Sequence, residues 1–215
     1  MLWRQGSYFM SGGREKFLAC VDVSRETYEK LQVYEGLLKK WQSKINLISR
    51  NSIENIWQRH FLDSAQIYPL LSRNAGNVLD VGTGAGFPGV VLSIMGARDV
   101  HLVEQNKKKC SFLGEVLRKT GTKATVHSCK IEEFPVATFD VVTARALTSL
   151  DGLLRMLSPY FGPETVGLFP KGRQVNEELT VANKNWNINY SLAQSISSTE
   201  GKIVVIKDGV SGREQ

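Results

Sequence analysis

Residues 79–89 read Leu-Asp-Val-Gly-Thr-Gly-Ala-Gly-Phe-Pro-Gly, and they carry the strongest local signal for the architecture. Its apolar opening predicts a short strand, and the helical pattern from Val90 onward predicts a helix directly after the turn. Gly82, Gly84 and Gly86 leave three positions without a side chain where the strand gives way to the helix. We therefore predict a strand–turn–helix unit in which a ligand can contact backbone N–H groups.

The spacing of the glycines argues against a phosphate ligand. A dinucleotide fingerprint would place its third glycine at position 87, where Phe87 stands, and no Gly-Lys-Ser/Thr follows to make a P-loop. Asp80 precedes the first glycine and would repel a pyrophosphate but attract an ammonium group. Glu104 ends the next predicted strand, where a carboxylate can accept the hydroxyls of a ribose. A cationic, phosphate-free nucleoside meets both conditions, which predicts S-adenosylmethionine as the cofactor.

Short apolar segments alternate with helical patterns on the C-terminal side of this turn. Helices are predicted near 90–95 and 107–119, and strands over 77–81, 100–104, 124–127, 139–144 and 165–169. Such alternation is typical of βαβ units and predicts a parallel sheet. Two further strand-like segments, 188–192 and 202–207, are expected to close one edge of that sheet.

The part of the chain before the turn has a different pattern. Residues 1–22 show no period, and we predict a disordered leader there. Residues 23–76 carry two apolar stripes at helical spacing and are predicted to pack on the core as a helical segment. Residues 77–215 then form the core of what we expect to be a single domain.

Composition excludes several classes of protein. The 215 residues are 42% hydrophobic and 22% charged, which is typical of a globular protein rather than a collagen-like or disordered one. We expect no membrane span and no secretory signal, because no apolar run approaches about 20 residues. Three widely spaced cysteines fit neither a disulfide framework nor a metal motif, so we expect a reducing cytoplasm and no metal site.

The charge is unevenly distributed. The net charge is +6, and the first 76 residues alone carry 11 basic and 7 acidic side chains. A basic surplus in a short segment indicates a polyanionic partner.

Several motifs together resemble the bacterial 16S ribosomal RNA guanine-N7 methyltransferases, the RsmG or GidB family. Besides 79–89, the matching segments are Trp41 to Leu47, His60 to Ser64, Val142 to Leu147, and Lys171-Gly172. The resemblance runs from about residue 25 to 207. It implies a Rossmann-like fold of the class I S-adenosylmethionine-dependent methyltransferases, with a mostly parallel seven-stranded sheet, helices on both faces and an N-terminal helical extension.

The resemblance also implies an activity, a partner and site residues. The activity is methyl transfer to N7 of a guanine in 16S ribosomal RNA (guanine 527), in the cytoplasm, by a monomer acting on this RNA or on the small subunit. Arg145, Lys171 and Arg173 are expected to position the substrate. The cofactor is expected to contact Asp80, Gly82, Gly84, Gly86, Phe87, Glu104, Ile131, Glu132 and Arg145.

No residue is predicted to act as a general base, because guanine N7 offers a free lone pair and carries no proton. Simpler roles stay open for some residues: Glu132 as a solvated helix start, Arg145 as a structural ion-pair partner, and His60 as a half-buried core side chain. Two other functions also stay open. One is methyl transfer to a small molecule or a protein, and the other is a non-catalytic role in ribosome assembly.

Overall fold

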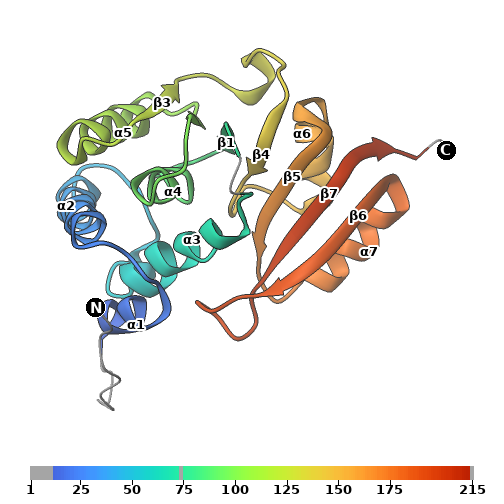
Figure 1. Cartoon of the computed structure of the whole chain (residues 1–215). Helices are drawn as coiled ribbons and strands as arrows, with labels where there is room; N and C mark the ends of the chain where they lie inside the picture. Colours follow the sequence, from blue (N-terminus) through green and yellow to red (C-terminus); the bar gives the residue numbers. More distant parts are fainter. Residues whose placement is uncertain (1–11, 73–74, 214–215) are drawn as a thin grey trace.

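The computed structural model describes residues 12–72 and 75–213. One sheet has the strand order β3-β2-β1-β4-β5-β7-β6 (Figure 1). Its strands are β1 (Val78–Val81), β2 (Val100–Val103), β3 (Ala124–His127), β4 (Phe139–Thr143), β5 (Phe161–Lys171), β6 (Trp186–Gln194) and β7 (Lys202–Gly212). The helices are α1 (Gly13–Cys20), α2 (Arg25–Gln42), α3 (Asp63–Ala65), α4 (Gly89–Ile94), α5 (Lys107–Thr120), α6 (Leu150–Leu157) and α7 (Val175–Asn185). Short turns of other helix types are η1 (Arg50–Ser52), η2 (Trp57–Leu62, a π-helix), η3 (Tyr68–Leu70), η4 (Ile131–Glu133) and η5 (Ser158–Tyr160).

The sheet confirms the prediction of a mostly parallel, seven-stranded architecture. Strands β3, β2, β1, β4 and β5 pair in parallel, whereas β7 runs antiparallel between β5 and β6. The carboxyl ends of β1, β2 and β4 therefore meet at one edge of the sheet. Ligands bind at this edge in open α/β sheets.

Neighbouring residues of a strand point to opposite faces of the sheet, and each face has its own hydrophobic cluster. Val78 of β1 and Val141 of β4 belong to the first, whereas Leu79 and Val142 belong to the second. The first cluster receives side chains from α2, η2, α4 and α5, and the second receives those of α6 and α7. Helices thus cover both faces, as expected for a parallel sheet.

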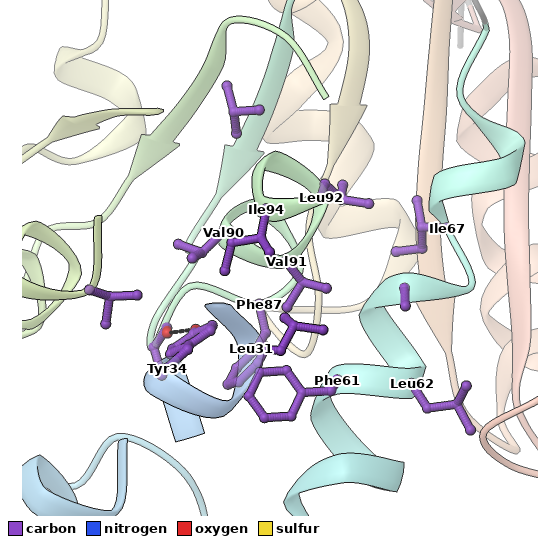
Figure 2. Close-up of a cluster of buried hydrophobic side chains, with 14 of the residues drawn as sticks. Leu31, Tyr34, Phe61, Leu62, Ile67, Phe87, Val90, Val91, Leu92 and Ile94 are labelled. Carbon is purple, nitrogen blue, oxygen red and sulfur yellow. Dashed lines mark hydrogen bonds between the residues drawn. The ribbon is translucent and has the colours of Figure 1, made fainter. Parts of the chain in front are cut away.

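The N-terminal helical segment packs directly on the glycine turn (Figure 2). Tyr34 of α2 stacks on Phe87 with a centroid distance of 5.3 Å, and its hydroxyl donates to the carbonyl of Ala85. Phe61 of η2 meets the same Phe87 ring edge-on at 5.6 Å. The segment is therefore one wall of whatever site the turn forms.

The structure differs from the sequence prediction at the N-terminus. Residues 13–20 form α1 inside the segment predicted to be disordered, and residues 1–11 lie outside the described residues. Phe17 explains the difference, because its ring is fully buried and packs edge-on against Trp57 at 5.2 Å. Helices α6 and α7 and the full length of β5 were not predicted either.

Candidate active site

The glycine turn satisfies most of its own backbone donors. The N–H groups of Gly82 and Thr83 donate to the carbonyl of Val103, and those of Gly86 and Phe87 donate to the carbonyl of Thr83. The prediction that this turn offers free N–H groups is therefore wrong for these donors. What the turn offers instead is backbone without side chains.

Only part of the turn is open to a ligand. Gly82 and Gly84, both with positive φ, line a cleft, and a Cβ on Gly84 would meet nothing closer than the Gly82 carbonyl at 3.8 Å. Gly86, also with positive φ, lies below them, and its Cβ would come within 2.6 Å of Tyr34 Oη and Val90 Cγ2. Gly86 is therefore a packing glycine rather than an exposed one.

Asp80 is fully buried beneath the turn. Its Oδ2 atom accepts hydrogen bonds from the Thr83 hydroxyl at 2.5 Å and from the Gly89 N–H at 2.8 Å. Burial raises the pKa of this carboxyl to about 7, although those two hydrogen bonds act in the opposite direction. Asp80 thus shapes the turn and the start of α4, and its Oδ1 atom is buried without a hydrogen-bond partner among the described residues.

Glu104 lies beside the turn, immediately after β2. Its carboxylate accepts from the Gly84 N–H at 3.0 Å and from the Asn106 N–H at 2.7 Å. The acidic group predicted to receive a ribose is therefore adjacent to the glycine that leaves open space. This pair of features fits a nucleoside cofactor.

A cleft of about 1030 Å³ lies at the carboxyl edge of the sheet. It is lined by Gly82, Gly84 and Phe87 of the turn, by Arg145 and Lys171 after β4 and at the end of β5, by Ser49, Arg59 and Asp63 of the N-terminal segment, and by residues 195–202 between β6 and β7. The cleft brings five predicted site residues together: Gly82, Gly84, Phe87, Arg145 and Lys171. Asp80, Gly86, Glu104, Ile131, Glu132 and Arg173 are not among its lining residues.

Arg145 joins the sheet edge to the N-terminal segment. Its guanidinium donates to the Arg59 carbonyl at 3.0 Å, to Asp63 Oδ2 at 3.1 Å and to His60 Nδ1 at 2.9 Å. The same group lies over the Phe87 ring at 5.2 Å. Arg145 therefore does form the structural ion pair that the sequence analysis left open as its role.

His60 is stacked on Phe87 with a centroid distance of 4.9 Å. Burial, together with the charges of Arg145 and Arg59, lowers the pKa of this imidazole to about 3. Since Arg145 can only donate, Nδ1 of the neutral ring is the acceptor, which leaves the proton on Nε2. In the part of the chain that the structure describes, the buried Nε2 atom has no hydrogen-bond partner. Held in this way, His60 is a poor proton acceptor.

Lys171 and Arg173 differ although they are neighbours. The Lys171 side chain is only 8% exposed, and its ammonium contacts Glu178 Oε2 at 2.8 Å and the Thr148 carbonyl at 2.7 Å. Glu178 also accepts from the Leu150 N–H, at the start of α6. Lys171 therefore secures the loop after β4, whereas Arg173 is exposed.

Ile131 and Glu132 belong to η4, which follows β3. Ile131 is buried, and its carbonyl accepts from the Tyr160 hydroxyl at 2.8 Å. Glu132 is exposed. The assignment of both residues to an adenine site stays a prediction.

One wall of the cleft has no counterpart among the residues predicted from the sequence. Residues 195–202 approach η2 and α3, where the Gln66 carboxamide accepts from the Ile196 N–H at 2.8 Å. The Ser197 hydroxyl donates to Asp63 Oδ1 at 2.6 Å. Asp63 stands in the His60 to Ser64 motif and could have been found there, but the serines carry no comparable signal.

Within residues 12–72 and 75–213, no three His, Cys, Asp or Glu side chains gather closely enough to hold a metal ion. Over the same residues, no helix combines the length and apolar character needed to cross a bilayer.

Comparisons with known proteins agree with this geometry. Residues 27–206 match the family model described as "rRNA small subunit methyltransferase G". Proteins named "Ribosomal RNA small subunit methyltransferase G" from Paramagnetospirillum magneticum and Parvibaculum lavamentivorans are 45% and 44% identical to the chain. The alignments cover 94% and 93% of the chain and 99% and 93% of those proteins.

Solved structures share the fold at low sequence identity. A ribosomal protein L11 methylase from Lactobacillus delbrueckii subsp. bulgaricus aligns with a TM-score of 0.57 and 16% identity, covering 68% of this chain and 77% of its own. A TehB-like SAM-dependent methyltransferase from Corynebacterium glutamicum aligns with a TM-score of 0.55 and 14% identity, covering 82% of this chain and 98% of its own. The chain has a Rossmann-like methyltransferase fold and uses S-adenosylmethionine as its cofactor. Because the family model matches residues 27–206, which is most of the chain, the chain belongs to the rRNA small subunit methyltransferase G family.

Proposed function

We propose that this protein transfers a methyl group from S-adenosylmethionine to N7 of a guanine in 16S ribosomal RNA, in the cytoplasm. The resemblance of its motifs suggests guanine 527 as the target. We choose a nucleophilic nitrogen that needs no deprotonation because of one observation about the side chains of the cleft. The imidazole and two of the carboxylates of the cleft are already held by hydrogen bonds or ion pairs.

The three side chains concerned are those of His60, Asp63 and Glu178. His60 has a pKa lowered to about 3 by burial and by its cationic neighbours, and its Nδ1 accepts from Arg145. Asp63 accepts from Arg145 and Ser197, and Glu178 is paired with Lys171. A general base needs a free lone pair and a pKa near the working pH. These three groups are thus poor general bases, which favours a nucleophile that reacts without losing a proton, as guanine N7 does.

S-adenosylmethionine supplies an electrophilic methyl group carried on a sulfonium. The protein's contribution is then to bind and orient the two reactants, which can account for a large part of a rate enhancement. We assign the cofactor side to Gly82, Gly84 and Glu104, because the open backbone of Gly84 lies beside the Glu104 carboxylate and Gly82 lines the cleft next to it. Arg145 fixes the wall opposite by holding Asp63 and His60.

The RNA must present its base in an accessible form. N7 faces the major groove, which is deep and narrow in A-form RNA. The target guanine is therefore unpaired or turned out when it enters the cleft. Exposed Arg59 and Arg173 are our candidates for RNA contacts at the rim, whereas buried Lys171 acts by holding the loop after β4.

The test is methyl transfer with labelled cofactor to small ribosomal subunits from cells that lack this protein. We expect one labelled site, identified as N7-methylguanine by chemical cleavage of the RNA at that base. Label found in a ribosomal protein or in a small molecule would show that this molecule, and not the RNA, is the substrate. Tight subunit binding without any transfer would instead indicate an assembly factor that lacks turnover.

A further inference from the structure

A second hollow is separated from the cleft by a single turn of the chain. It has a volume of about 590 Å³ and follows α2 along the chain. We call it the basic hollow, and its lining residues are Lys39, Gln42, Ser43, Lys44, Ile45, Asn46, Arg50 and Ile53. Three of these residues are cationic and none is acidic.

The cations of the basic hollow differ in how far they are neutralised. Lys39 pairs with Glu35 at 2.7 Å, and Glu35 also contacts Arg14. Lys44 and Arg50 are exposed, and neither forms an ion pair with any residue in the ranges 12–72 and 75–213. Two positive charges thus face a concave surface without a counter-charge from the described chain.

The turn that carries these charges is held in shape by one side chain. The Gln42 carboxamide donates to the Ile48 carbonyl at 2.9 Å and accepts from the N–H groups of Leu47 and Ile48 at 3.0 Å each. Next, the Ser49 hydroxyl donates to Ser52 Oγ, at 3.0 Å, at the η1 turn that Arg50 begins. A turn fixed by such bonds presents its charges without a further cost of ordering the backbone on binding.

The same turn borders the cleft from the other side. Leu47, Ile48, Ser49 and Ser52 line the cleft, whereas Lys44, Ile45 and Arg50 line the basic hollow. An extended chain that leaves the cleft over this turn therefore reaches the basic hollow directly. The Asn46 carboxamide lines the basic hollow beside the cations, and amide donors of this kind accompany Lys and Arg in contacts to RNA phosphates.

We propose that the basic hollow binds backbone phosphates of the ribosomal RNA that flank the nucleotide in the cleft. The inference rests on the proposed function for its choice of RNA as the partner. Bound there, the RNA strand is anchored outside the reacting centre, so the basic hollow sets affinity and register rather than the chemical step. Charge neutralisation by Lys44 and Arg50 makes this contribution dependent on salt.

The test removes the two unpaired charges and compares a matched control. The variant carries Lys44→Gln and Arg50→Gln. The control carries Lys184→Gln and Lys207→Gln, which remove the same charge from exposed positions of α7 and β7 that line neither the cleft nor the basic hollow. For each full-length protein, the affinity for naked 16S ribosomal RNA is measured across a range of KCl concentrations.

We expect the plot of log affinity against log salt to become shallower by about 1 to 2 for the variant, because each lost phosphate contact removes roughly 0.7 to 0.9 of slope. The control should keep the wild-type slope. In methyl transfer, KM for the RNA substrate should rise while kcat and cofactor affinity stay unchanged. Arg50→Lys should retain most of the salt slope.

Other outcomes overturn the proposal. Equal slopes for variant and control would show that the basic hollow carries no phosphate. A loss of affinity for whole subunits but not for naked RNA would assign the surface to a ribosomal protein. These results remain distinct from a failure of the proposed function, because RNA binding is measured without methyl transfer and a wild-type protein that binds but does not methylate still gives a slope to compare.

Discussion

The two halves of the cleft are held together in different ways. On the β1–β2 side, the glycine turn bonds to its own residues and to the strand beside it, as in the bond from Gly82 N to Val103 O. On the β4–β5 side, Arg145 reaches Asp63, which lies 82 positions earlier in the chain. The first half is a local structure that a motif can encode, whereas the second half exists only when distant segments have packed.

The largest effect is expected where the distant segments meet. Replacing Arg145 by Met should lower the free energy of unfolding by about 3 kcal/mol, because a largely buried Asp63 loses its counter-charge. Methyl transfer should fall with it. Urea unfolding followed by tryptophan fluorescence measures the stability change.

A double variant separates the charge from the packing. Adding Asp63→Asn to Arg145→Met removes the unpaired carboxylate, so the combined loss should be smaller than the sum of the two single losses. Strict additivity would mean that the two side chains are not coupled and that this half of the cleft is held by something else.

The same contrast explains what the sequence could predict. The turn at residues 79–89, the strands around it and the position of Glu104 were predicted correctly, because glycine spacing and hydrophobic alternation are local signals. Burial of Lys171 against Glu178 was not predicted, since that contact depends on α7, which the sequence reasoning missed. Phe17 was missed for a similar reason, because one ring in an aperiodic segment becomes core only through Trp57.

The second prediction compares two glycines inside the local half. Gly86→Ala should destabilise the fold by about 2 to 3 kcal/mol, because its Cβ would overlap Tyr34 and Val90 at a positive φ. Gly84→Ala should cost only about 1 kcal/mol for its backbone conformation, since the space around it is open. The Gly84 variant should instead bind S-adenosylmethionine more weakly in calorimetry.

If the two substitutions destabilised the protein equally, packing would not distinguish the glycines. If Gly86→Ala weakened cofactor binding in a stable protein while Gly84→Ala did not, the assignment of the open position would be reversed.

A third prediction separates positioning from direct RNA contact on the β4–β5 side. Lys171→Met should reduce methylation of small-subunit RNA by roughly tenfold, about 1.4 kcal/mol of transition-state stabilisation, with cofactor affinity intact. Its salt slope for RNA binding should stay at the wild-type value, because the ammonium is bonded to Glu178 and Thr148. Arg173→Gln should give a shallower slope, since this exposed cation forms no ion pair with any residue of 12–72 or 75–213 and can meet a phosphate.

A shallower slope for Lys171→Met would show that the ammonium leaves Glu178 to contact RNA. Unchanged turnover and unchanged binding in that variant would remove Lys171 from the site altogether.

The smallest effect is expected from pH, because the two halves respond to it in opposite directions. Asp80 has a pKa raised by burial from 3.8 to about 7, so the folded state binds its proton more tightly and the associated stability is lost as pH rises toward 7. His60 has a pKa lowered by burial and nearby cations from 6.5 to about 3, so its associated stability is lost as pH falls below 6.5. Between about pH 4 and 6.5 the two slopes oppose each other, and the wild-type protein should show little net change from this pair. Denaturant titrations over that range should therefore show stability rising with pH in Asp80→Asn and falling with pH in His60→Gln. Parallel curves for the two variants would mean that neither buried group has a pKa shifted from its value in the unfolded chain.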